Sequence, residues 1–125
     1  LDAGRMEKRV AHWRSVIASA CEQSGRASLP TLAAPAAVAD AARTIDADAT
    51  KLTLDPVGAV SLATVQVAAS AVVVAIGPEG GWSPRDRDAL SAAGFIGLRL
   101  GPRILRTETA GLAAIAALQS RFGDL

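Results

Sequence analysis

Two apolar runs, each followed by a glycine-bearing segment and a helical pattern, constrain the fold more than any other feature of the chain. The first run is Ala71-Val72-Val73-Val74-Ala75-Ile76, which leads into Gly77-Pro78-Glu79-Gly80-Gly81-Trp82-Ser83. The second run is Ile96 to Leu100, which leads into Gly101-Pro102. The first run is continuous, which is typical of a strand that is buried on both faces of a parallel sheet. Repetition of strand, loop and helix predicts an α/β fold.

Periodicity predicts the elements that precede these runs. Apolar residues at steps of three and four predict a helix over residues 5–24, which ends at Gly25 in the left-handed conformation. An alanine-rich stretch predicts a short helix over 36–43, and alternation predicts a strand over 50–54. The segment 57–69 fits no single period, and we expect a loop there that can include a short helix.

Two helices are expected after the apolar runs. Ser83 is placed to cap the first, with Pro84 at its first position, Asp86 as the short arm of a capping box and Gly94 at its end. The second helix is expected from Thr107 to Phe122, with Thr107 as the N-cap.

Composition limits what such a fold can belong to. The chain has 125 residues, of which 50% are hydrophobic, so we expect one core and a single domain over residues 1–125. The formal net charge of +1 gives no field that would attract a polyanion to the whole surface, so a nucleic-acid site would have to be a local cluster of arginines. Cys21 is the single cysteine, which excludes a disulfide framework, and we expect no metal site.

The first residues do not fit the pattern of a signal peptide, and the longest apolar stretch does not fit a membrane-spanning helix. Charged residues at 5, 7, 8 and 9 stand where a signal peptide needs an apolar core. The longest apolar stretch, Ala68 to Ile76, is too short to cross a bilayer as a helix. We therefore expect a soluble, cytoplasmic protein with no membrane partner.

The first glycine segment is a candidate ligand loop. Ligands of open α/β sheets bind outside the carboxyl ends of the strands, where this loop begins. Gly77, Gly80 and Gly81 allow main-chain amides to approach a ligand that a Cβ would push away. The loop has neither the Walker ending nor the dinucleotide spacing, and Glu79 would repel a phosphate. The alternative is a tight turn between strand and helix, in which Pro and Gly have only a conformational role.

The second glycine segment favours the binding role. Arg103 and Arg106 lie three residues apart beside Thr107, Glu108 and Thr109, which is a dense polar cluster in so apolar a chain. A threonine cap and an acidic residue near a helix N-terminus explain part of this cluster. They do not explain two arginines, so we expect the two segments to line one cofactor pocket made largely of backbone.

These motifs resemble those of a known family. Gly77-Pro78-Glu79-Gly80-Gly81-Trp82-Ser83 and Leu100-Gly101-x-Arg103-Ile104-Leu105-Arg106-Thr107-Glu108-Thr109-Ala110, with Glu22-Gln23-Ser24-Gly25-Arg26 upstream, closely resemble the bacterial 16S rRNA uridine-N3 methyltransferase family, a branch of the knotted SPOUT methyltransferases. The resemblance covers essentially the whole chain, more weakly between residues 27 and 70. Asp86 stands where that family commonly has Glu.

The resemblance implies a fold and a cofactor. The fold is a SPOUT-type, mostly parallel sheet with flanking helices and a C-terminal trefoil knot, an exception to the usual absence of knots. S-adenosylmethionine would bind among the knot loops. Carried over by position, its binding residues are Leu54, Ile76, Gly77, Pro78, Glu79, Gly80, Gly81, Leu100, Gly101, Ile104, Leu105 and Thr107. Members also form homodimers through the knot region and act on 16S rRNA of the small ribosomal subunit. They normally begin with a PUA-like RNA-binding barrel and a first strand and helix, which we expect to be missing from this sequence.

The resemblance also suggests catalytic residues. N3 of uracil must lose its proton before it attacks the methyl group, and negative charge then spreads to the carbonyl oxygens. Arg106 is the candidate for stabilising that charge, and Glu79 is the candidate for accepting the proton or facing the sulfonium. The alternatives are that Arg106 pairs with Glu108 or Glu79 as a structural ion pair, and that Glu79 binds backbone amides.

Candidate RNA-binding residues lie in the first helix and just after it. They are Arg5, Arg9, Gln23 and Arg26, and the alternative for them is an ordinary solvated face. Two other functions stay open. One is a knotted tRNA or rRNA methyltransferase of different specificity, and the other is a catalytically incompetent dimerisation or RNA-binding fragment.

Overall fold

The computed structural model describes residues 2–67 and 71–125. The chain divides into two compact units, Leu1–Ala37 and Val38–Leu125, and each is described by itself. The single domain over 1–125 stays a prediction. Residues 68 and 69 of the ambiguous segment, and 68–70 of the longest apolar stretch, lie outside the described residues. No helix in the described part of the chain is long and apolar enough to cross a membrane.

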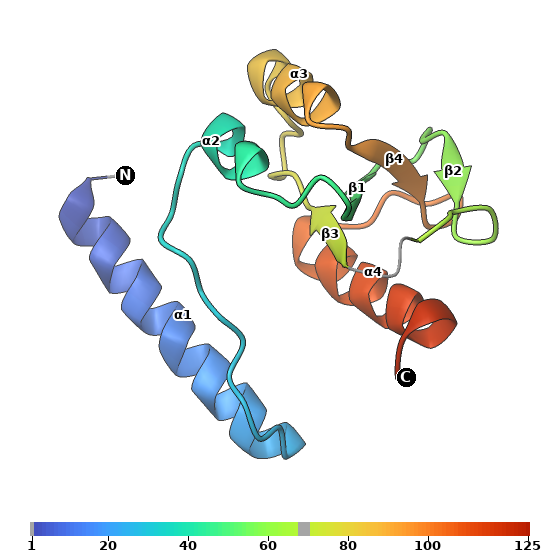
Figure 1. Cartoon of the computed structure of the whole chain (residues 1–125). Coiled ribbons are helices and arrows are strands. Elements are labelled where there is room, and N and C mark those ends of the chain that lie inside the picture. The colour runs from blue at the N-terminus through green and yellow to red at the C-terminus, as the bar shows by residue number, and fades with distance from the viewer. Residues whose placement is uncertain (1, 68–70) are drawn as a thin grey trace. The chain divides into compact units, whose positions relative to one another are not determined.

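The first unit consists of helix α1 (Ala3–Ser24) and the chain that follows it (Figure 1). The helix begins at Ala3, before the expected position, because Asp2 caps it: the Asp2 carboxylate accepts a hydrogen bond of 2.8 Å from the backbone N–H of Arg5. At the other end Gly25 has φ of 74°, which confirms the predicted left-handed termination.

The second unit contains a four-stranded sheet whose pairs are all parallel. Its strands are β1 (Thr50–Leu54), β2 (Val60–Ser61), β3 (Val72–Ala75) and β4 (Ile96–Arg99), in the order β2-β4-β1-β3. The predicted parallel sheet and the strands expected at 50–54, 71–76 and 96–100 are therefore confirmed, with ends that differ by one residue or less.

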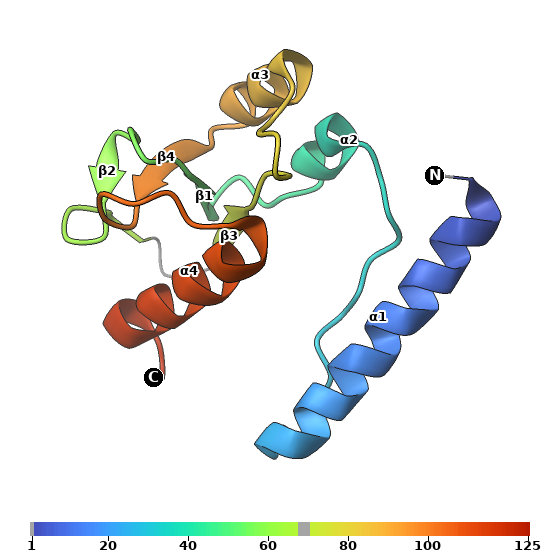
Figure 2. The ribbon, with the colours of Figure 1, turned by 180° about the vertical axis from the view of Figure 1, so that it is seen from behind.

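Helices cover both faces of this sheet. They are α2 (Val38–Arg43), α3 (Pro84–Ala92) and α4 (Thr107–Phe122). Figures 1 and 2 show the sheet between α4 on one side and α3 with α2 on the other. The predicted cap of α3 is confirmed, because the Ser83 hydroxyl accepts a hydrogen bond of 3.1 Å from the backbone N–H of Asp86. Gly94, with φ of 94°, follows its C-terminus.

The core lies between the sheet and α4. Leu52 and Leu98, in the neighbouring strands β1 and β4, have no exposed surface, and Val65 and Leu118 pack with them. Each such burial contributes roughly 1.5–3 kcal/mol relative to an exposed side chain. On the opposite face, the ammonium of Lys51 donates a hydrogen bond of 2.9 Å to the Ala93 carbonyl at the C-terminal end of α3. A cation at that position stabilises the helix dipole.

Two predictions about the strands were wrong. We expected β3 to be buried on both faces, but all four of its residues are only half-buried, because in the described sheet it is an edge strand paired with β1 alone. We expected loop or short helix over 57–69, but Val60–Ser61 forms β2. A strand of two residues is too short to leave a periodic pattern. It is held in place by pairing with β4 and by Arg99, whose Nε donates a hydrogen bond of 2.8 Å to the Gly58 carbonyl.

A close approach of two glycines fixes the turn before β2 against β4. A Cβ at Gly58 would lie 2.5 Å from the carbonyl carbon and oxygen of Gly97. Real Cβ atoms do not approach backbone so closely, so the turn depends on the missing side chain at this position.

We predict that Gly58→Ala lowers the free energy of unfolding by about 1–3 kcal/mol, because the added methyl group forces the turn away from β4. Urea unfolding followed by circular dichroism measures this change. The matched control is Gly80→Ala, whose Cβ meets nothing within 4 Å and whose φ is not positive. This control is expected to leave the stability unchanged or to raise it by up to about 1 kcal/mol. Equal unfolding midpoints for Gly58→Ala and the unsubstituted chain would contradict the argument.

Candidate ligand-binding cavity

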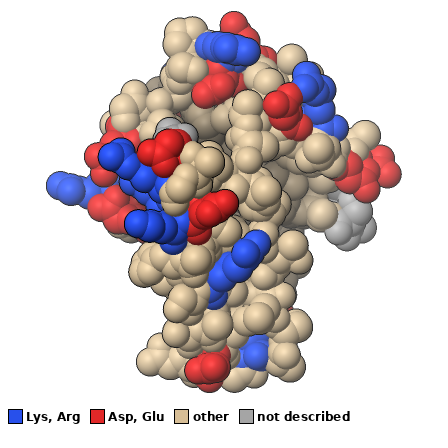
Figure 3. Space-filling view, turned by 90° about the vertical axis from the view of Figure 1, so that its left-hand side faces the viewer, with Lys and Arg blue, Asp and Glu red and all other residues tan. Residues whose placement is uncertain are grey.

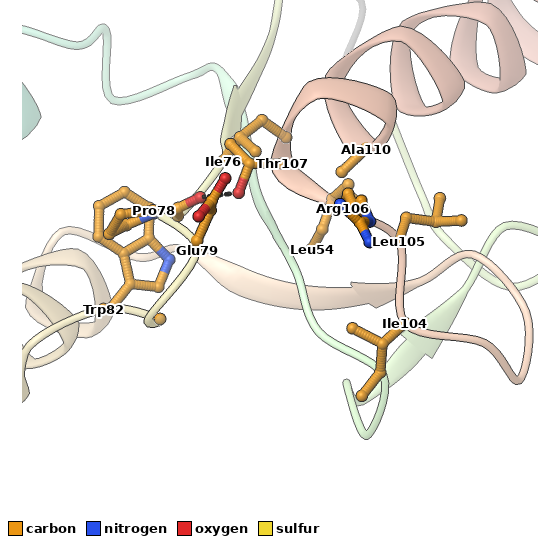
Figure 4. Close-up of a pocket in the computed structure, with 12 residues that line it drawn as sticks. Leu54, Ile76, Pro78, Glu79, Trp82, Ile104, Leu105, Arg106, Thr107 and Ala110 are labelled. Atoms are coloured by element: carbon orange, nitrogen blue, oxygen red, sulfur yellow. Dashed lines mark hydrogen bonds between the residues drawn. The ribbon is translucent and has the colours of Figure 1, made fainter.

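An open cavity of about 460 Å³ lies at the carboxyl ends of β1, β3 and β4 (Figure 4). It is lined by the end of β1, the loop after β3, the loop after β4 and the first turn of α4. The lining residues are Leu54, Ile76, Gly77, Pro78, Glu79, Gly81, Trp82, Ile104, Leu105, Arg106, Thr107 and Ala110. We call it the first cavity. Its volume is in the range of sites for small organic ligands.

The parallel sheet explains why the two glycine segments meet. β1 is paired with β3 on one side and with β4 on the other, and parallel strands end at the same edge. The loops that begin at Ile76 and Leu100 therefore leave the sheet at the same edge, one on each side of the end of β1. The Thr107 hydroxyl donates a hydrogen bond of 3.0 Å to the Gly77 carbonyl and so ties one loop to the other.

The expected role of Thr107 as an N-cap was wrong. The N-cap of α4 is Arg106, which makes no capping hydrogen bond with its side chain. Thr107 has already entered the helix, and its hydroxyl is used by the loop from β3 instead. The sequence could not distinguish these two uses, because the acceptor lies thirty residues away in the chain.

Gly77 lies close to a residue of the site that the sequence analysis did not include. A Cβ at Gly77 would lie 3.2–3.4 Å from three adjacent atoms of the Trp82 indole. The similar distances mean that Gly77 sits over the five-membered ring. Trp82 and Ala110 both line the first cavity and were not among the predicted binding residues. Their presence inside the two motifs was the signal that could have found them.

Most of the predicted cofactor residues line the first cavity. These are Leu54, Ile76, Gly77, Pro78, Glu79, Gly81, Ile104, Leu105 and Thr107. Leu100 and Gly101 line a neighbouring hollow of about 90 Å³, which shares Leu54, Ile104, Leu105 and Ala110 with the first cavity. Gly80 lines neither of them.

The two predicted catalytic side chains face the first cavity from different loops. Figure 4 shows Glu79 and Trp82 on one side, and Arg106 with Ile104 on the other. Both Glu79 and Arg106 are exposed. Within the part of the chain that the structure describes, neither side chain makes an ion pair or a hydrogen bond, so the structural ion pair and the amide-binding alternatives are wrong. Both charges remain available to a ligand.

The predicted RNA-binding residues belong to the first unit, and the first cavity belongs to the second. All four are exposed. Arg5 pairs with Asp2 at 3.6 Å, and Nε of Arg26 donates a hydrogen bond of 2.9 Å to the Ser28 carbonyl. On the face seen in Figure 3, basic and acidic side chains lie intermixed, as the small net charge leads one to expect.

The fold and the first cavity define a class of protein. A parallel α/β unit holds a cavity walled by apolar side chains and glycine-rich backbone, with one carboxylate and one guanidinium on opposite sides. Such a site suits a small organic molecule of mixed polarity better than a polyphosphate, which would need several cations.

Comparison with known proteins identifies the family. Residues 2–119 match the family described as the RNA methyltransferase domain, and the chain belongs to this family. It is similar to the ribosomal RNA small subunit methyltransferase E of Buchnera aphidicola, with 37% identity over 118 residues, covering 94% of this chain and 48% of the relative. The corresponding enzyme of Mycobacterium tuberculosis is 36% identical over 129 residues, covering 97% of this chain and 49% of the relative.

Solved structures agree with this assignment. A methyltransferase from Legionella pneumophila in complex with S-adenosylmethionine superposes with a TM-score of 0.92 and 38% identity, covering 100% of this chain and 51% of that one. Ribosomal RNA small subunit methyltransferase E of Neisseria gonorrhoeae, bound to S-adenosylmethionine, superposes with a TM-score of 0.90 and 41% identity, covering 97% of this chain and 51% of that one. The chain thus spans about half the length of the relatives it matches.

We predict that Thr107→Val lowers the free energy of unfolding by about 1 kcal/mol, because the Gly77 carbonyl loses its donor while the shape of the side chain is kept. Thr107→Ser keeps the hydroxyl and is expected to retain most of the stability. The control is Thr109→Val, an exposed threonine in the same turn whose hydroxyl has no partner among the described residues. Equal losses for the two valine variants, measured by urea unfolding, would show that the bond between the loops contributes nothing.

Proposed function

We propose that this chain is the catalytic domain of an S-adenosylmethionine-dependent methyltransferase that acts on N3 of a uridine in 16S rRNA. The observation that carries the proposal is the first cavity, which is lined largely by two of the three motifs on which the family resemblance rests. The Legionella and Neisseria structures, similar over essentially the whole of this chain, contain S-adenosylmethionine. The names of the relatives support rRNA of the small ribosomal subunit as the substrate, and the resemblance in the motifs supports N3 of a uridine as the acceptor.

The residues of the first cavity fit the cofactor. Leu54, Ile76 and Leu105 form an apolar wall against which an adenine ring can lie, and the glycine loops offer backbone amides and carbonyls for its polar edge. Gly80, Leu100 and Gly101 remain proposed cofactor residues at the margin of this wall. When bound, the cofactor supplies an activated methyl group on a positively charged sulfur. The carboxylate of Glu79 suits a positive charge, because opposite charges attract.

The reaction needs positioning and charge stabilisation more than covalent chemistry. A bond forms between N3 and the methyl carbon, the bond from that carbon to sulfur breaks, and the N3 proton leaves to a base or to water. The guanidinium of Arg106, free of protein partners among the described residues, is proposed to stabilise the negative charge on a uracil carbonyl oxygen. Glu79 is proposed to accept the proton or to face the sulfonium.

The surface of α4 supports the proposed homodimer. Ala114 and Leu118 are buried against the sheet, yet Leu112 is 73% and Ile115 61% exposed on the same helix. A helix that is apolar on both its buried and its exposed side is expected to be covered by a further protein surface. We propose that a second copy covers it, in the region where the resemblance places a trefoil knot.

The RNA-binding role of Arg5, Arg9, Gln23 and Arg26 stays a proposal, as does the cytoplasmic location that a ribosomal substrate implies. Their exposure supports it, since a phosphate backbone is contacted by accessible arginines.

We predict that S-adenosylhomocysteine binds the chain in isothermal titration calorimetry, and that Ile104→Asp weakens binding at least about tenfold by placing a carboxylate in the apolar wall. Ile104 is 82% exposed, so the substitution leaves the core intact. The control is Val57→Asp, equally exposed at 85% and outside the first cavity. Absence of heat with the unsubstituted chain would overturn the proposed cofactor site.

We predict that Arg106→Ala slows methyl transfer to small ribosomal subunits that lack this modification by about 100-fold, with little change in the affinity for S-adenosylhomocysteine. Arg103→Ala, three residues away and outside the first cavity, is expected to change the rate less than about tenfold. Mass spectrometry of the rRNA locates the methyl group. Transfer to a ribose or another base would favour a knotted methyltransferase of different specificity. Cofactor binding without any transfer would favour a dimerisation or RNA-binding module.

A further inference from the structure

A second cavity, of about 300 Å³, lies beside the first. It is bounded by the end of β1, by α3 and by the loop that carries Trp82. Leu54, Gly81 and Trp82 belong to both linings, so the two cavities share a rim. The proposed cofactor site accounts for the first cavity and leaves the second without a role. Its size is at the lower end of the range for small-ligand sites, which suits a single nucleoside.

Trp82 is the shared wall. Gly77 covers one side of its five-membered ring and lines the first cavity but not the second. The indole thus borders the second cavity without Gly77 between them. A half-buried indole that faces an open cavity is a surface on which a flat ring can stack, and stacking of a nucleic-acid base on an aromatic side chain contributes about 1–3 kcal/mol.

The other walls of the second cavity select against a phosphate. Leu90 and Phe95 supply a buried apolar floor. Asp55 and Arg87 bring opposite charges to the rim, and one carboxylate oxygen of Asp55 is held by a hydrogen bond of 3.0 Å from the backbone N–H of Val57. A net charge near zero favours a neutral molecule that carries both donors and acceptors. A pyrimidine base is such a molecule.

We propose that the acceptor uracil occupies this second cavity, stacked on Trp82 with a carbonyl oxygen toward the guanidinium of Arg87. The inference rests on the proposed function, because it needs a methyl donor in the first cavity. The shared rim at Leu54 and Gly81 is where N3 of the base would meet the methyl group. An RNA base reaches such a cavity only when it leaves its stack, so the target nucleotide is read in an extruded conformation.

Tryptophan fluorescence tests the proposal on the chain itself. The sequence has two tryptophans, Trp13 and Trp82, so Trp13→Phe leaves Trp82 as the single reporter. With the first cavity saturated by S-adenosylhomocysteine, added uridine is expected to quench this fluorescence saturably. Ser91→Phe fills the second cavity without touching the first and is expected to weaken uridine binding at least about tenfold. Ala92→Phe, exposed on the same helix and outside the lining, is the control and is expected to bind like the reporter chain.

Arg87→Gln provides a second variant that does not depend on filling the cavity. The side chain of Arg87 is exposed and makes no hydrogen bond or ion pair among the described residues, so the variant is expected to fold and to bind uridine several-fold more weakly. Calorimetry with S-adenosylhomocysteine is done on every variant and separates the two hypotheses. Absence of that heat in the reporter chain overturns the proposed function. Heat without uridine quenching, or quenching that Ser91→Phe and Arg87→Gln both leave unchanged, overturns the uracil site alone.

Discussion

The parallel pairing of β1 with both β3 and β4 is the constraint on which the candidate site depends. Because the three strands run in the same direction, their carboxyl ends meet at one edge, and the loops that leave them share a small volume. Leu52 and Leu98, fully buried in adjacent strands, hold this pairing in register against α4. A one-residue slip of either strand would turn its leucine out of this core to the other face of the sheet, so the hydrophobic core also fixes the position of the loops.

The loops after β3 and β4 are connected to each other once they leave the sheet. The hydrogen bond from Thr107 to the Gly77 carbonyl joins them, and the Trp82 indole packs against Gly77. Binding to a cavity that is preformed in this way loses less free energy to the ordering of its loops. Trp82 also borders the second cavity, so one side chain can control the spacing between donor and acceptor. Methyl transfer is sensitive to that spacing because it requires an in-line approach.

Much of the fold could be predicted from local pattern. The Gly25 termination, the Ser83 cap and the parallel strands follow from residue type and period, which act over a few residues. The failures share a physical cause. β2 forms because β4 and Arg99 provide partners about forty residues away, and β3 is half-buried because only β1 pairs with it in the described sheet. Pairing between residues so far apart in the chain cannot be recognised from a short window of sequence.

The candidate site likewise has features that follow from the local sequence and features that depend on tertiary contacts. The sequence by itself determined which segments line the first cavity, because glycines that admit a ligand to the backbone, apolar neighbours and an arginine are properties of residue type. It also determined the family, through motifs whose order and spacing are rarely met together. Only the tertiary structure decided that Thr107 joins two loops instead of capping a helix, that Arg106 and Glu79 stay unpaired within the described residues, and that Trp82 stands between two cavities. These facts depend on which side chains meet after folding, and distances between residues far apart in the chain are set by the packing of the whole sheet.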